Sequence, residues 1–315
     1  MQQRSVVVTG ATGLVGTKVV QKLLSLNDTV HAVVHRHPPI GHPATRMPTK
    51  DIASGVVLHT VDLATVKPDW TWMEDIQPAA VIHCAAMTNV DECERDPSSA
   101  YAINERATRS LAEVCARYGA HLVLVSTDYV FDGSDEYPGP YNEEDPAHPL
   151  NHYGRSKWQG EVAVQDICEG RTAWSICRTA VVYGSTPWTR ANFLTWLLAK
   201  LRNRESVKIA SDQVSSPTLA DDLADMLIEI VRQQASGIFH TAGSTIIDRY
   251  QFALAIANQF GLDSSLIRPI TTRELQQAAP RPLKAGLCID KITQKLGVIP
   301  LSLDEGLLRF KENFL

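Results

Sequence analysis

The chain has 315 residues, of which 44% are hydrophobic and 21% are charged. This balance excludes a disordered chain, and the length allows one large domain or a core domain with a smaller one. The net charge of −5 lacks the basic surface of a nucleic-acid-binding protein, so no nucleic-acid partner is expected.

The first expected element is an apolar strand, Val6–Thr9, which begins almost directly after the N-terminus. This arrangement lacks the layout of a signal peptide, and no later apolar run approaches the length needed to span a bilayer. We therefore expect a cytoplasmic protein with no membrane partner.

A glycine turn follows this strand, with Gly10, Gly13 and Gly16 at three-residue spacing. An amphipathic helix then begins, whose free amide groups and dipole favour a phosphate. Strand, glycine turn and helix in this order predict a dinucleotide-binding site. The turn residues assigned to the cofactor are Gly10, Thr12, Gly13, Leu14 and Val15.

The second strand, Thr29–Val34, indicates which dinucleotide is bound. A carboxylate at its end would bind the 2′-hydroxyl of NAD, but Asp28 precedes the strand instead. Arg36 follows the strand and suits a 2′-phosphate, which favours NADP, with NAD as the alternative. The competing interpretation makes Arg36 a solvated loop residue. His35 and His37 flank it without further ligands nearby, so no metal site is expected.

The third and fourth strands, Val56–Thr60 and Ala79–His83, are each followed by a candidate cofactor contact. Asp62 and Leu63 lie where an adenine would be expected. The small residues Cys84, Ala85 and Ala86 would let the cofactor cross the sheet edge. Simple packing is the alternative for both sets. No C-x-x-C pair occurs, so neither a zinc site nor a dithiol motif is indicated.

The clearest helix begins at Asp96-Pro97, a capping residue followed by proline at the first helical position. Apolar residues recur at steps of three and four up to Tyr118, and Gly119 ends the helix. The pattern predicts one helix over this range.

The fifth strand, His121–Ser126, leads to a candidate reactive centre. Tyr153 and Lys157 lie one turn apart at the start of a helix that ends near Glu169. A nearby ammonium stabilises a phenolate, and Thr127 follows the fifth strand, so a hydroxyl can meet the same ligand atom.

The sixth strand, Thr172–Arg178, completes an alternation of strands and helices that predicts an α/β fold: a doubly wound parallel sheet of the Rossmann type. We assign residues 1–184 to the dinucleotide-binding domain, to which 219–243 returns, and 185–315 to a smaller substrate-binding region. Further helices are expected near Ala191–Arg202, Leu219–Gln233, Arg249–Phe260 and Asp304–Lys311.

These motifs together resemble the extended short-chain dehydrogenases/reductases that act on nucleotide sugars. Within that superfamily, the chain is similar to the dTDP-4-dehydrorhamnose reductase family of dTDP-rhamnose biosynthesis. The specific matches lie in the segments Met87–Glu94, Ser126–Gly133, Pro149–Lys157, Arg178–Gly184 and Asp212–Thr218.

The resemblance implies an NAD(P)-dependent oxidoreductase that reduces the 4-keto group of a nucleotide-linked deoxysugar. It implies that Tyr153 donates the proton, Thr127 hydrogen-bonds the oxygen and Lys157 lowers the pKa of the phenol. Asp128 lies near the sugar, and Asn104 supports the lysine through water; an amide satisfied within its own helix is the alternative for Asn104. The implied substrate-binding residues are Thr88, Val90, Asp91, Thr127, Asp128, Tyr129 and Arg281.

Two departures refine the resemblance. Related 4,6-dehydratases have a Thr-Asp-Glu run after the fifth strand, whereas Tyr129 replaces the glutamate here, which disfavours elimination. In the C-terminal region Lys284 and Ala285 replace the family's usual polar pair after Arg281, so the reaction type is better indicated than the substrate. Lys284 could contact a phosphate or be solvated.

Two alternatives stay open at this point. The first is a regulatory protein that binds NADP without turnover, as in the similar regulatory subunit of methionine adenosyltransferase. The second is another nucleotide-sugar epimerase or reductase of the superfamily. The intact set of Thr127, Tyr153 and Lys157 favours an enzyme, because a binding protein needs no proton donor. A homodimer is the assembly to test.

Overall fold

A computed structural model describes residues 4–35, 56–186 and 191–314, and its centre is a seven-stranded sheet. All neighbouring strands of this sheet are parallel, in the order β11-β6-β5-β4-β1-β2-β3, so the strand order reverses between β1 and β4. The predicted doubly wound α/β fold is confirmed. The strands are β1 (Ser5–Thr9), β2 (Thr29–Val34), β3 (Val56–Thr60), β4 (Ala80–His83), β5 (His121–Thr127), β6 (Trp174–Thr179) and β11 (Gly237–His240).

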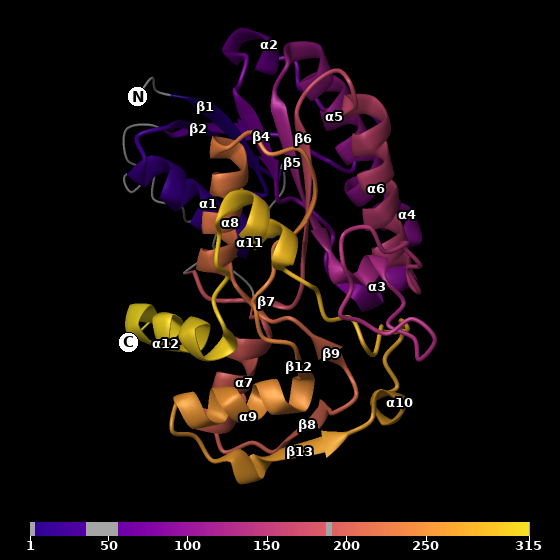
Figure 1. Cartoon of the computed structure of the whole chain (residues 1–315), viewed down its shortest axis with the longest axis vertical. Coiled ribbons are helices and arrows are strands. Elements are labelled where there is room, and N and C mark those ends of the chain that lie inside the picture. Colours follow the sequence, from indigo (N-terminus) through magenta and orange to yellow (C-terminus); the bar gives the residue numbers. More distant parts are fainter. Residues whose placement is uncertain (1–3, 36–55, 187–190, 315) are drawn as a thin grey trace.

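Helices cover both faces of this sheet and bury a separate core on each (Figure 1). Helices α1 (Leu14–Ser25) and α8 (Ala220–Arg232) pack on one face, where Val8, Leu23 and Leu227 are fully buried. Helices α5 (Ala107–Tyr118) and α6 (His152–Cys168) pack on the other face. Thus α8 and β11, which come from the segment 219–243, lie with the first part of the chain.

The helix predicted from Asp96-Pro97 to Gly119 is interrupted, which corrects the expectation of one regular helix. Helix α4 (Pro97–Tyr101) leads into a π-helical turn, Ala102–Arg106, before α5 begins. A π turn inserts residues without breaking the chain of helical dihedrals, so apolar spacing does not reveal it. The turn contains Asn104, which is almost fully buried.

The C-terminal half forms a second packed unit with its own core, beside the carboxyl ends of the sheet strands (Figure 1). Helices α7 (Phe193–Arg202), α9 (Arg249–Gln259) and α12 (Leu303–Phe314) enclose this core with β8 (Val207–Ala210) and β13 (Ile267–Ile270). The remaining elements are short. They are α2 (Met73–Ile76), α3 (Val90–Arg95), β7 (Val182–Tyr183), β9 (Val214–Ser215), β10 (Thr218–Leu219), β12 (Ile247–Asp248), α10 (Thr272–Leu275) and α11 (Asp290–Leu296).

None of the helices in the described ranges combines the length and apolarity of a membrane span. The same residues contain no cluster of three or more histidine, cysteine, aspartate or glutamate side chains that could hold a metal ion.

Candidate active site

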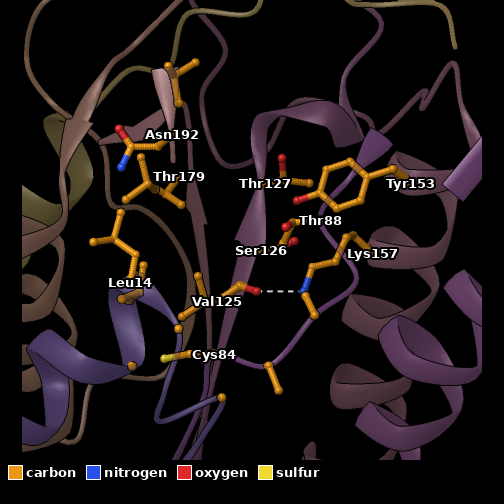
Figure 2. A pocket seen from close by; sticks show the side chains of 18 of the residues that line it. Leu14, Cys84, Thr88, Val125, Ser126, Thr127, Tyr153, Lys157, Thr179 and Asn192 are labelled. Carbon is orange, nitrogen blue, oxygen red and sulfur yellow. Dashed lines mark hydrogen bonds between the residues drawn. The ribbon is translucent and has the colours of Figure 1, made fainter. Parts of the chain in front are cut away.

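A cavity of about 900 Å³ opens where the carboxyl ends of β1, β4 and β5 meet. This is the edge at which the strand order reverses, the usual ligand position in an open parallel sheet. Figure 2 shows its two walls: Leu14 and Asn192 lie on one side, and Tyr153 and Lys157 on the other.

The glycine turn between β1 and α1 forms one wall and is fixed by close backbone contacts. Gly10 has φ +64°, and a Cβ atom there would lie 2.8 Å from Ala85 Cα. A Cβ atom on Gly16 would lie 2.2 Å from the Gly10 carbonyl oxygen, whereas one on Gly13 would lie 3.2 Å from the same atom. The turn can therefore close only with glycine at position 16. A Cβ atom at position 13 would contact the turn less closely.

The start of α1 suits a phosphate group. Its N-cap residue is Gly13, which offers no side chain to the first amide groups of the helix. Those amides and the helix dipole favour an anion from the cavity. Thr12, Leu14 and Val15 line the cavity beside them, and Cys84, Ala85 and Ala86 line it from the end of β4.

The residues predicted to contact the adenosine part have different positions. Arg36 lies outside the described residues. Asp62 does not line the cavity; its Oδ1 accepts a hydrogen bond of 3.0 Å from Ala64 N and lies 3.8 Å from His35 Nε2. The Leu63 side chain is only 7% exposed and packs in the core beneath α5. Only its backbone could reach a ligand, so Leu63 offers no side-chain contact.

Tyr153 and Thr127 come together at the carboxyl end of β5, where the Thr127 hydroxyl lies beside the Tyr153 phenol (Figure 2). Asn151 caps α6 by accepting a 2.8 Å hydrogen bond from Gly154 N, which fixes Tyr153 in the first turn. A Cβ atom on Gly154 would lie 2.2 Å from Tyr129 O. The absence of a side chain there lets α6 approach the strand end.

Lys157 lies one turn further along α6 and is 2% exposed. Its Nζ donates a 2.8 Å hydrogen bond to the carbonyl oxygen of Val125, drawn as the dashed line in Figure 2. Burial lowers the pKa of Lys157 to about 8, so the ammonium form still predominates near neutral pH.

The pKa of Tyr153 is governed mainly by burial, and the lowering of this pKa by Lys157 stays a prediction. Burial raises this pKa well above its ordinary value, and the nearby Thr127 hydroxyl opposes the rise only in part. In this arrangement the ammonium is engaged by the backbone of β5. The phenol is therefore neutral and can act as a proton donor.

Asp128 is 2% exposed and accepts a 3.1 Å hydrogen bond from the Thr127 hydroxyl to its Oδ1. Burial raises the pKa of its carboxyl group to about 7, with smaller opposing effects from Thr127 and Arg249. This carboxyl group therefore exchanges its proton near neutral pH inside the cavity.

The Asn104 amide is hydrogen-bonded by partners on the loop after β4 and on α6. Its Nδ2 donates to Met87 O and to Ser156 Oγ, both at 3.0 Å, and its Oδ1 accepts from Met87 N at 2.8 Å. These bonds tie the loop after β4 to α6, one residue before Lys157. Neither partner belongs to the helix that contains Asn104, so its amide is not satisfied within its own helix, and its support of Lys157 stays a prediction.

A buried ion pair that the sequence patterns did not indicate supports the same strand end. Arg178 Nη2 lies 2.7 Å from Glu161 Oε2, and both side chains are at most 4% exposed. Ser126 Oγ donates a 2.5 Å hydrogen bond to Glu161 Oε1. The pair therefore links β5, β6 and α6 directly behind the Thr127–Tyr153 contact.

The predicted substrate-binding residues divide into two groups. Thr88, Val90 and Tyr129 line the cavity, as do Thr127 and Asp128. Asp91 and Arg281 do not line it; they pair with each other, with Arg281 Nη2 3.0 Å from Asp91 Oδ1. Lys284, at the departure from the family pattern, is half exposed and pairs with Asp135 at 2.6 Å.

The C-terminal half supplies cavity residues that no sequence motif predicted. Val181 has φ +43°, a strained conformation for a β-branched residue at a ligand-binding site. Asn192 caps α7, and Arg249 is the first residue of α9. The capping residues of α7 and α9 can be recognised in the sequence, so the starts of both helices are predictable. Nothing in the sequence indicates that these two helix starts lie at the cavity. The other lining residues of this group are Thr179, Val182 and Ala191.

Comparison with known proteins gives a consistent result over the whole chain. The RmlD substrate binding domain family matches residues 4–315. The chain is 33% identical over 309 residues to a "probable low-salt glycan biosynthesis reductase" of Haloferax volcanii, covering 98% of this chain and 97% of that one. It is also 33% identical over 301 residues to methionine adenosyltransferase 2 subunit beta of Xenopus laevis, covering 94% and 83%.

A solved structure of similar shape is dTDP-4-dehydrorhamnose reductase of Bacillus anthracis in complex with NADP. It superposes with a TM-score of 0.79 at 27% identity, covering 99% of this chain and 100% of that one.

Proposed function

This chain belongs to the RmlD substrate-binding family, and we propose that it is an NADPH-dependent oxidoreductase that reduces the 4-keto group of a nucleotide-linked deoxysugar. The observation that carries the proposal is the contact between the Tyr153 phenol and the Thr127 hydroxyl, with Lys157 one turn away, in a cavity that begins at a dinucleotide-type glycine turn.

The glycine turn fits the cofactor. The uncapped amides at the start of α1 face the cavity and suit a pyrophosphate, and the small residues Cys84, Ala85 and Ala86 leave room for the cofactor to cross the sheet edge. When bound there, NADPH supplies the hydride. We propose Arg36 as the partner of the 2′-phosphate, Asp62 and the Leu63 backbone as contacts of the adenine, and NAD as the weaker alternative.

The chain's own residues handle the proton. Tyr153 is neutral and donates its proton to the carbonyl oxygen as hydride reaches the carbonyl carbon. The Thr127 hydroxyl donates to Asp128 Oδ1 in the structure and would turn its hydrogen to the same carbonyl oxygen when the keto sugar binds. The positive charge of Lys157 stabilises the phenolate that remains, and Asn104 keeps α6 in register with the loop at Met87.

Some features belong to the same proposal in finer detail. We propose that residues 1–184, joined by 219–243, form the cofactor-binding domain and that 185–315 form the substrate-binding region. Thr88, Val90 and Tyr129 would contact the substrate directly, while Asp91 and Arg281 act as an ion pair that shapes the site. A homodimer and a cytoplasmic location complete the proposal.

The regulatory alternative has one observation in its favour, the similarity to methionine adenosyltransferase 2 subunit beta. It predicts cofactor binding without turnover. The complete set of Thr127, Tyr153 and Lys157 in contact with the cavity supports an enzyme instead.

The proposal is tested by turnover. The purified chain is mixed with NADPH and a panel of 4-keto-6-deoxysugar nucleotides, and the loss of NADPH absorbance is followed together with the product's configuration. Oxidation that depends on the keto sugar supports the proposal. Tight NADPH binding without oxidation on any of these substrates would support the regulatory alternative.

A further inference from the structure

One arginine at the cavity forms no direct ion pair with any residue that the structure describes. Arg249 is half buried and lines the cavity from the first position of α9. Among the described residues its guanidinium has no hydrogen-bond or ion-pair partner; its recorded contact is with the ring of Phe193, whose centroid lies 4.9 Å from Arg249 Cζ.

Neighbouring arginines differ in this respect. Arg178 is paired with Glu161 at 2.7 Å, and Arg281 with Asp91 at 3.0 Å. A guanidinium removed from bulk water is costly unless it is paired. Arg249 thus differs from these two arginines, because its guanidinium lines the cavity without a direct ion pair among the described residues.

The charges around Arg249 leave room for an anion. Burial lowers the pKa of Arg249; Tyr129 and Asp128 oppose this effect, and the charge of Arg281 adds to it. Asp91 already forms an ion pair with Arg281. Asp128 faces Arg249 but is only partly ionised near neutral pH, because burial raises the pKa of its carboxyl group to about 7. The guanidinium of Arg249 therefore faces a carboxyl group that balances its charge only in part.

A helix terminus adds to this charge. Phe193, on which Arg249 stacks, is the first residue of the ten-residue helix α7, and its cap Asn192 also lines the cavity. The dipole at this terminus favours negative charge. A guanidinium beside it presents paired donors that match phosphate oxygens.

We propose that Arg249 binds the diphosphate of the nucleotide-linked substrate and thereby selects nucleoside diphosphate sugars over free or monophosphate sugars. The cofactor's pyrophosphate has its own position at the start of α1, so the anion at Arg249 belongs to the second ligand. This inference rests on the proposed function, since it assigns a substrate contact within the same cavity.

The test compares ligands that differ only in their phosphates. With NADPH bound, dissociation constants are measured by calorimetry for a nucleoside, its monophosphate and its diphosphate, using the base that binds best among dTDP, UDP, GDP, ADP and CDP. The variants are Arg249→Met, which keeps the packing on Phe193, and Arg249→Lys. Lys284→Met is the matched control, because it removes one positive charge from an exposed pair outside the cavity.

We expect Arg249→Met to weaken the diphosphate by about tenfold to about a hundredfold, the value of a charge-assisted hydrogen bond, with the nucleoside and NADPH unchanged. The diphosphate affinity of Arg249→Lys should lie between those of Arg249→Met and the original protein. The diphosphate affinity of Lys284→Met should equal that of the original protein.

Three results would overturn the inference: equal weakening of nucleoside and diphosphate, unchanged diphosphate affinity, or a selective loss of NADPH. Failure to bind any of the diphosphates overturns the inference and the proposed function together. Diphosphate binding without keto-sugar turnover overturns the proposed function alone, and the Arg249 comparison is still decided.

Discussion

The two walls of the cavity are built in different ways. On the sheet side, the site residues come from short motifs at the ends of β1, β4 and β5 and in the first turn of α6, and each motif can be recognised in the sequence by itself. On the C-terminal side, Asn192 and Arg249 are brought together from two helices by the packing of α7 against α9. The positions of the residues on the sheet side, where we propose that the cofactor binds, follow from the ends of the strands. The positions of the residues on the C-terminal side, where we propose that the substrate binds, follow from the packing of helices that are far apart in the sequence.

The largest expected effect comes from breaking the cofactor wall at Gly16. Gly16→Val places a branched side chain where a Cβ atom alone would lie 2.2 Å from the Gly10 carbonyl, so the turn cannot close. We expect complete loss of NADPH binding, measured by fluorescence titration of the nicotinamide.

Gly119→Ala is the matched control, because nothing lies within 4 Å of a Cβ atom there, although its φ of +70° costs some stability. It should bind NADPH normally. Retained affinity in folded Gly16→Val would mean that the dinucleotide lies elsewhere.

The next effect concerns the ion pair behind the reactive centre. Glu161→Gln leaves Arg178 buried without its counter-charge, which costs about 3–5 kcal/mol of unfolding free energy. Urea unfolding measures the loss. The matched change Glu105→Gln breaks a more exposed pair with Arg109 and should cost less than about 1 kcal/mol. Equal costs for the two variants would show that the buried pair does not anchor the strand end.

The sequence predicted the sheet side of the molecule closely. The bounds predicted for strand β2 agree with the structure, because a strand buried on both faces of a parallel sheet is a continuous apolar run that ends where polar residues begin. The π-helical turn at Asn104 was missed, since the spacing of apolar residues stays near-helical through it.

Arg249 was missed for a different reason. It sits in an ordinary capped helix start, and its role depends on Phe193, which lies 56 residues earlier. No local sequence pattern predicts the contact between Arg249 and Phe193. For the same reason Asp91 and Arg281, taken from the family pattern, turned out to pair with each other beside the cavity.

The smallest expected effect is a change in the pH dependence of stability caused by Asp128, which lies in the cavity between the two walls. Because burial raises the pKa of folded Asp128 to about 7, the folded state holds a proton that the unfolded state has released, so stability falls as pH rises toward that value. Asp128→Asn removes this dependence. We expect the variant to gain on the order of 2 kcal/mol relative to the original between about pH 5 and about pH 8.

Urea unfolding of both proteins at the two pH values measures this change. A constant difference between them would show that Asp128 does not hold a proton in the folded state.

The central claim, that the Tyr153 phenol is the proton donor, is tested most directly by separating cofactor binding from turnover. Tyr153→Phe removes only the hydroxyl that meets Thr127, so the dissociation constant of NADPH should be unchanged while kcat falls by at least about a hundredfold. Lys157→Met is the companion variant; it also loses the bond to Val125 and should impair both quantities. Normal turnover by Tyr153→Phe would contradict the account.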